Sequence, residues 1–156
     1  MRIAVYKDAD DVIALYEAIP SSCKARNKTI VDRHGNAAVV EVSTTSVAVR
    51  RAVNSLLVYS SNSYVADGQK PLTEQVRHSA YVQNTKAREV RLAELCSGKR
   101  HLETSDAMTI VQDTNDGKTG QVCLDNRVMY TRYGSLWNCR DVSLTFFPGH
   151  PATTAP

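Results

Sequence analysis

The chain has 156 residues, of which 42% are hydrophobic and 22% charged, and this composition fits one globular domain of ordinary size. A chain of this length buries about two thirds of its unfolded surface, so it needs neither disulfides nor a structural metal to fold. Lys and Arg number 19 against 16 Asp and Glu, a net charge of +3, and the basic residues are scattered. Binding to a nucleic-acid backbone is therefore not expected.

Cysteine and histidine positions indicate neither a metal site nor a disulfide framework. The four cysteines include no CxxC pair, and the four histidines are equally dispersed. They are Cys23, Cys96, Cys123, Cys139, His34, His78, His101 and His150. We expect reduced thiols, no bound metal, and histidines at surface or turn positions.

The N-terminal residues do not resemble a signal peptide. Asp8, Asp10 and Asp11 fall where a signal peptide needs an uninterrupted apolar core, and no other run approaches the ~20 apolar residues of a membrane span. These features predict a soluble, cytoplasmic protein with no membrane partner.

The N-terminal part of the chain predicts a strand, a helix and a hairpin. Residues 3–6 form a short apolar run, and Asp8 provides an N-cap for a helix that Pro20 ends. Two runs at 29–32 and 37–42 flank a polar turn, which is typical of a β-hairpin.

The next stretch predicts a helix followed by an irregular loop. The hydroxyl side chains at 43–45 offer N-cap oxygens for a helix over 46–59, whose apolar positions share one face and leave Arg50 facing water. Residues 60–70 are rich in Ser, Asn, Asp and Gly, a composition typical of a loop. Such loops often carry function.

The second half of the chain predicts further strands and helices. A strand near 75–83 and a helix over 86–96 are favoured, with one helix over 73–95 as the alternative. The strands predicted after these lie at 107–112, 120–124, 127–133 and 142–147, with a turn cluster at 113–117. Residues 148–156 form a tail of Pro, Thr and Ala that is expected to be disordered.

Residues 37–125, taken in order, predict β-α-β-β-α-β, which is the order of the ferredoxin-like fold. In that fold two helices cover one face of an antiparallel sheet, and the other face needs burial. We therefore expect a single α+β domain over 1–147, an α-β sandwich whose bare sheet face favours oligomerisation.

Four short segments within 37–125 stand in an order and spacing that match a known family. They are 47–59, Tyr64-Val65-Ala66-Asp67-Gly68-Gln69 with Leu72-Thr73, Lys86-Ala87 with Leu92-Ala93, and Met108-Thr109-Ile110-Val111. In this order they resemble the phage-encoded enzymes that degrade S-adenosylmethionine, the SAM lyases formerly called SAM hydrolases. The resemblance implies a homotrimer similar to the PII-like signalling proteins, with the substrate bound where subunits meet and no cofactor.

The resemblance also implies a reaction. In the family, the methionine carboxylate of S-adenosylmethionine attacks its own γ-carbon and releases 5′-methylthioadenosine and homoserine lactone, a phage counter-defence against restriction-modification in the host cytoplasm. A carboxylate and a sulfonium neutralise each other in the transition state, so a shaped and less polar pocket favours this step. No catalytic triad or activated water is required.

The candidate site residues lie in or beside the loop at 60–70. Tyr59 and Gln69 are the predicted catalytic residues, and the predicted substrate-binding residues are Tyr64, Asp67, Gly68 and Glu74. The family carries a glutamate where Gln69 aligns. Either the chain is an impaired variant that retains substrate, so that Gln69→Glu raises turnover, or the alignment is shifted and Asp67 or Glu74 takes that role.

Two other classes of function stay open. Residues 3–19 followed by 29–42 resemble the opening strand, helix and hairpin of GNAT-fold N-acetyltransferases, but only Gly68 is present near the glycine-rich turn that holds coenzyme A phosphates in that fold. A PII-like module that binds a host protein without chemistry is the third class. Trp137, the only tryptophan, is expected to anchor a core or an interface.

Overall fold

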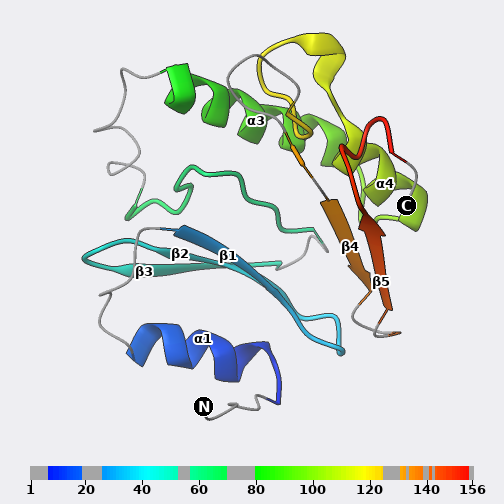
Figure 1. Cartoon of the computed structure of the whole chain (residues 1–156). Coiled ribbons are helices and arrows are strands. Elements are labelled where there is room, and N and C mark those ends of the chain that lie inside the picture. Colours follow the sequence, from blue (N-terminus) through cyan, green and yellow to red (C-terminus); the bar gives the residue numbers. More distant parts are fainter. Residues whose placement is uncertain are drawn as a thin grey trace. The chain divides into compact units, whose positions relative to one another are not determined.

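The computed structural model describes residues 7–18, 26–52, 57–69, 80–124, 131–132, 134–138, 141 and 143–154. The chain divides into two compact units, Met1–Val76 and Arg77–Pro156. Helices and antiparallel strands occur in both units, so this is a small α+β protein with antiparallel sheets (Figure 1). Among the described helices, none combines the length and the apolar character that crossing a membrane requires.

The described residues of the first unit form a three-stranded antiparallel sheet and a helix. These elements are α1 (Ala9–Ala18), β1 (Arg26–Val31), β2 (Ala37–Val42) and β3 (Val47–Arg51), with the strand order β1-β2-β3. The predicted helix and the predicted hairpin are confirmed. Asp8 caps α1, because its Oδ1 accepts the backbone N–H of Asp10 at 3.0 Å and of Asp11 at 3.1 Å. The strand predicted over 3–6 lies outside the described residues.

Asp32 organises the turn between β1 and β2. Its carboxylate accepts the Asn36 side-chain amide at 2.8 Å and the backbone N–H groups of His34 at 2.8 Å and Asn36 at 3.0 Å. It also accepts the backbone N–H of Ala9 at 3.2 Å, which ties the turn to the start of α1. These bonds, the one from the Asn36 side chain above all, lower the pKa of Asp32 from 3.8 to about 2.

The two faces of this sheet differ in polarity because side chains alternate along each strand. One face packs against α1 and forms the hydrophobic core of the unit. The buried residues of that core are Ile13, Ala38, Val40 and Val42. Residues 57–69 cover the opposite face, which carries Glu41 (Figure 1).

Strand β3 corrects the prediction of a helix over 46–59, because Val47–Arg51 pairs antiparallel with β2. Ser43 explains the difference, since a serine hydroxyl that can cap a helix can also close a turn. The Ser43 Oγ accepts the backbone N–H of Ser46 at 2.9 Å, and the Ser43 backbone N–H donates to the Ser46 carbonyl at 2.9 Å. The chain therefore reverses at 43–46 and enters a third strand.

The second unit is built from helices and a hairpin. It contains α3 (Ala80–Cys96), α4 (Thr104–Gln112), the short 3-10 helix η1 (Asn115–Gly117), β4 (Gly134–Asn138) and β5 (Ser143–Phe147). α3 corrects the strand predicted over 75–83 at residues 80–83, which are helical as in the long-helix alternative. Residues 70–79 lie outside the described part of the chain.

Helix α4 corrects the strand predicted over 107–112, and residues 120–124 are not a strand either. The β-branched residues of this stretch favour a strand locally, but the residues before them begin a helix. Asp106 accepts the backbone N–H of Glu103 at 3.1 Å and pairs with Lys99 at 2.7 Å. An acidic group in the first turn also interacts favourably with the helix dipole.

The C-terminal residues pack within the second unit. β5 confirms the strand predicted over 142–147 for residues 143–147, whereas most of the strand predicted over 127–133 lies outside the described residues. The expected tail includes residues 148–154, in which His150 and Pro151 are buried. The His150 carbonyl accepts the backbone N–H groups of Thr153 and Thr154, both at 2.9 Å.

Candidate functional site

The candidate site lies on the sheet face of the first unit that points away from α1. Asn27 of β1 is directly opposite Glu41 of β2, and Arg50 of β3 is opposite Val39, two residues before Glu41. Alternation places the side chains of Asn27, Glu41 and Arg50 on the same face. Each of the three strands therefore contributes a polar side chain beneath residues 57–69.

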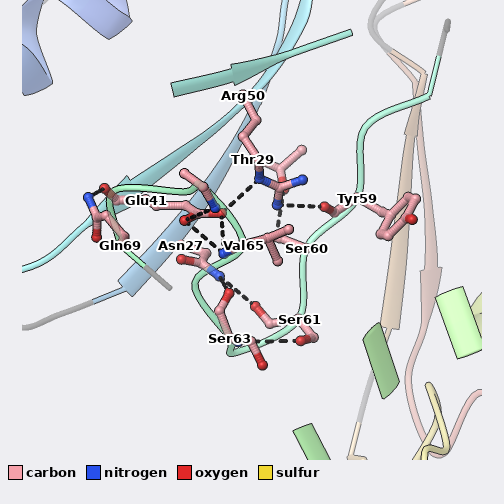
Figure 2. A network of polar contacts seen from close by, with 11 residues as sticks. Asn27, Thr29, Glu41, Arg50, Tyr59, Ser60, Ser61, Ser63, Val65 and Gln69 are labelled. Atoms are coloured by element: carbon pink, nitrogen blue, oxygen red, sulfur yellow. Dashed lines mark hydrogen bonds and ion pairs between the residues drawn. The ribbon is translucent and has the colours of Figure 1, made fainter. Parts of the chain in front are cut away.

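Glu41 is the centre of this polar face. Its side chain is 0% exposed, and its Oε1 lies 2.7 Å from the Arg50 Nε in an ion pair. The backbone N–H of Val65 lies 3.0 Å from both carboxylate oxygens, and that of Ala66 donates to Oε2 at 3.0 Å (Figure 2). A buried carboxylate is costly unless it is paired and hydrogen-bonded, and Glu41 meets both conditions.

Residues 57–69 have no regular secondary structure and are held by the strands beneath them. Asn27 Nδ2 donates to the carbonyl of Ser61 at 2.9 Å and of Ser63 at 2.7 Å. Arg50 Nη2 donates to the carbonyl of Tyr59 at 3.0 Å. Side chains of the sheet thus form hydrogen bonds with backbone groups that are not paired in a β-sheet, and these bonds fix the path of this segment.

The two predicted tyrosines of this segment have different surroundings. Tyr64 Oη donates to the Val42 carbonyl at 2.8 Å, and burial together with the negative charge of Glu41 raises the pKa of Tyr64. Tyr59 enters the network through its carbonyl oxygen, whereas its ring points away from the network (Figure 2). Tyr64 therefore anchors the segment through its hydroxyl group, whereas Tyr59 contributes its main-chain carbonyl to the network.

Gln69 is directed into the sheet. It is 1% exposed, and its Nε2 donates to the carbonyls of Glu41 at 2.7 Å and Ser46 at 3.3 Å. Its Oε1 is buried without a hydrogen-bond partner among the described residues. The amide therefore acts as a donor to main-chain carbonyls, a role that a carboxylate cannot fill.

The remaining predicted residues lie at the end of the segment or beyond it. Asp67 and Gly68 are exposed in a turn that the Gln69 backbone N–H closes onto the Ala66 carbonyl at 2.8 Å. Glu74 lies outside the described residues. The structure thus brings five of the six predicted residues into one segment, with Asp67 and Gly68 at its surface and Gln69 beneath it.

Sequence reasoning missed Glu41 and Asn27, and it placed Arg50 on a water-facing helix surface. The structure instead has Arg50 on a strand, 23% exposed and bonded to Glu41. One signal was available, because Glu41 is the only charged residue in the apolar run Ala37–Val42. A lone charge inside an apolar strand indicates a buried, paired group.

An open groove of about 740 Å³ lies elsewhere in the first unit, beside the start of α1 and the turn after β1. Lys7, Asp8, Asp32 and Arg33 are among its lining residues, and none of the six predicted site residues is. Its size is that of a small-molecule site. The groove and the predicted site residues therefore lie apart in the fold.

In the second unit, Cys123 and His150 form a buried pair. The Cys123 Sγ lies 3.4 Å from the His150 Nε2, which also lies 3.1 Å from the Leu124 carbonyl oxygen. His150 is 3% exposed, whereas the sequence predicts a surface or turn position for it. Within the described ranges, no three His, Cys, Asp or Glu side chains are grouped so that they could hold a metal ion.

No known protein family, curated protein or solved structure matches this chain. Fold and site together define a small α+β protein in which a polar sheet face supports an irregular segment.

Proposed function

We propose that the protein is a SAM lyase that converts S-adenosylmethionine to 5′-methylthioadenosine and homoserine lactone. The proposal includes a ferredoxin-like sandwich similar to the PII-like proteins, assembled as a homotrimer in the host cytoplasm with the substrate between subunits. One observation carries it. The buried carboxylate of Glu41 binds the backbone of Val65 and Ala66, so the matched run from Tyr64 to Gln69 is held in one defined conformation.

A defined conformation is what this reaction demands of a protein. The nucleophile and the leaving group belong to the same substrate, so the enzyme contributes orientation and a less polar surrounding. The Tyr59 ring would contact the sulfonium, and the exposed turn at Asp67 and Gly68 would contact the ribose or adenine. Tyr64 and Gln69 would act as positioning residues, because their polar atoms are bonded to carbonyls of the sheet region.

A second candidate is an N-acetyltransferase of the GNAT type. Two observations favour it. Helix α1 packs on the hairpin of β1 and β2, which agrees with the resemblance of this part of the chain to the opening of the GNAT fold. Residues 47–51 are a strand, whereas the resemblance to the lyases expects a helix there. Against it, the sequence has no glycine-rich turn for coenzyme A phosphates.

Thermal unfolding with three ligands separates the candidates. A ligand that binds only the folded state raises the melting temperature. The lyase proposal expects a rise with S-adenosylmethionine or 5′-methylthioadenosine and none with acetyl coenzyme A. The reverse preference overturns it in favour of the acetyltransferase, and no response to any of the three favours a binding module without chemistry.

A further inference from the structure

The hairpin of β4 and β5 has one buried face. Phe147 is 0% exposed and lies opposite Gly134 in the antiparallel register. A side chain at Gly134 would not fit, because its Cβ would come within 2.8 Å of the Pro151 ring and 3.2 Å of a Val111 methyl group. This face of the hairpin therefore packs against α4 and the turn that follows β5.

The other face of the hairpin is apolar and exposed. Trp137 is 72% exposed, and Leu144 and Phe146 are each 49% exposed. Trp137 lies directly opposite Leu144, and Phe146 is two residues from Leu144, so alternation places all three on one face. The indole Nε1 donates to the Ser135 Oγ at 3.2 Å, so the one polar atom of the indole is already bonded within the hairpin. We call Trp137, Leu144 and Phe146 the outer patch.

Charge distinguishes the outer patch from most of the surface. The ten residues of β4 and β5 include no charged side chain, although 22% of the chain is charged. Exposed strands are usually protected by charges, which oppose pairing with another chain. Two copies meeting through these strands would bring no like charges together and would remove no charge from water.

The area of the outer patch fits the centre of an interface. From their exposed fractions, the three side chains offer roughly 350 Å² of apolar surface, taking about 150–250 Å² for each fully exposed side chain. A stable interface takes about 800 Å² from each partner, with an apolar centre and a polar rim. The uncharged polar residues of the two strands would supply part of that rim.

We propose that the outer patch is the contact surface for a second copy of this chain. This proposal rests on the self-association included in the proposed function but not on the lyase chemistry. The sole tryptophan is then a natural probe, because its indole is exposed in one copy and buried between two.

Tryptophan emission and molecular mass, measured over a dilution series without ligand, test this proposal. We expect a mass that is a multiple of 17.2 kDa at high concentration, with blue-shifted emission that moves to the red as the complex dissociates. A mass of 17.2 kDa at every concentration overturns the proposal, whether the emission is red-shifted or blue-shifted. Constant blue-shifted emission of a single copy would mean that the same chain covers the patch.

Two variants locate the contact. Leu144→Glu and Phe146→Glu keep the probe and should each give single copies with red-shifted emission and an unchanged circular dichroism spectrum. The matched control is Val90→Glu on α3, since Val90 is 59% exposed but outside the hairpin, and it should associate like the unmodified protein. Association that survives both hairpin variants, or that Val90→Glu abolishes, overturns the assignment of the surface. Molecular mass and tryptophan emission do not depend on SAM turnover, so they test the contact surface even if the protein does not degrade S-adenosylmethionine.

Discussion

Glu41 and Arg50 lie nine residues apart on neighbouring strands, and their side chains form an ion pair of 2.7 Å whose carboxylate is fully buried. The same carboxylate accepts the backbone N–H groups of Val65 and Ala66. One side chain thus joins the sheet to the segment that carries the candidate site.

Glu41→Ala should therefore destabilise the fold and loosen residues 57–69. The change leaves the partly exposed Arg50 guanidinium without its partner and the backbone N–H groups of Val65 and Ala66 without their acceptor, which together should cost about 3–5 kcal/mol. Urea denaturation measures this loss, and hydrogen exchange should show faster exchange at the Val65 and Ala66 amides. Glu17→Gln is the control, because Glu17 is exposed on α1 and its change should stay within about 0.5 kcal/mol. Unchanged exchange at both amides would contradict the role given to Glu41.

Gln69→Glu tests whether this position acts in chemistry or in structure. The family alignment expects the restored charge to raise turnover. In the structure, the Gln69 amide donates to two carbonyls in a buried site, so a carboxylate there would face the Glu41 carbonyl at close range. We expect a loss of about 2–3 kcal/mol at pH 7 and no gain in turnover, because the unmade bonds and the buried charge are both unfavourable.

The pH dependence of this variant has a definite sign. Burial would raise the pKa of the new carboxyl group in the folded state, so the part of the penalty that comes from its charge should be absent at acidic pH and grow as the pH rises through that pKa. Urea denaturation at pH 4 and pH 7 measures the difference. Gln83→Glu on the exposed side of α3 is the control and should show no such growth. A rise in turnover with unchanged stability would instead support the catalytic role that the family alignment gives to position 69.

Asp32 should make the protein sensitive to acid. Its pKa of about 2 in the folded state lies below its ordinary value of 3.8, so its carboxylate stabilises the fold above pH 4 and this contribution is lost as the pH falls towards 2. Asp32→Asn should lower the melting temperature at pH 7 and flatten its fall between pH 4 and pH 2. If the melting temperatures of both proteins fall by the same amount between pH 4 and pH 2, this would contradict the hydrogen bonding described for the turn.

Tyr64→Phe should cost about 1 kcal/mol, the usual net value of one hydrogen bond, here the bond to the Val42 carbonyl. The pKa of Tyr64 is raised in the folded state, so the neutral hydroxyl stabilises the fold below pH 10 and this contribution is lost as the pH rises further. The unmodified protein should therefore lose more stability than Tyr64→Phe above pH 10. Urea denaturation at pH 8 and pH 10.5 measures the difference, and equal losses would contradict the burial of the Tyr64 hydroxyl.

Local sequence signals predicted part of this fold. Asp8 as a cap and the polar turn between two apolar runs were sufficient for α1 and the hairpin of β1 and β2. Ser43 misled the prediction because the same hydroxyl serves a helix cap or a turn, and only pairing with β2 decides between them. Helix α4 was missed because its β-branched residues outweighed Asp106 in the local pattern.

The sequence predicted an irregular segment at residues 60–70, and the structure has one at 57–69, but the orientation of its side chains was not predicted. The composition of residues 60–70 indicated a functional loop, and the structure keeps five of the six predicted residues in one segment. That Gln69 points beneath this segment depends on contacts with Glu41, 28 residues away, and with Ser46. Contacts at that separation leave no periodic signal in a single sequence.

Product analysis tests the proposed lyase most directly. Purified protein incubated with S-adenosylmethionine should yield 5′-methylthioadenosine and homoserine lactone in equal amounts, separated by chromatography and sampled early, before the lactone hydrolyses. Equal amounts of 5′-methylthioadenosine and homoserine from the first time point would indicate attack by water instead of the substrate carboxylate. Consumption of S-adenosylmethionine no faster than in buffer alone would contradict the proposed function.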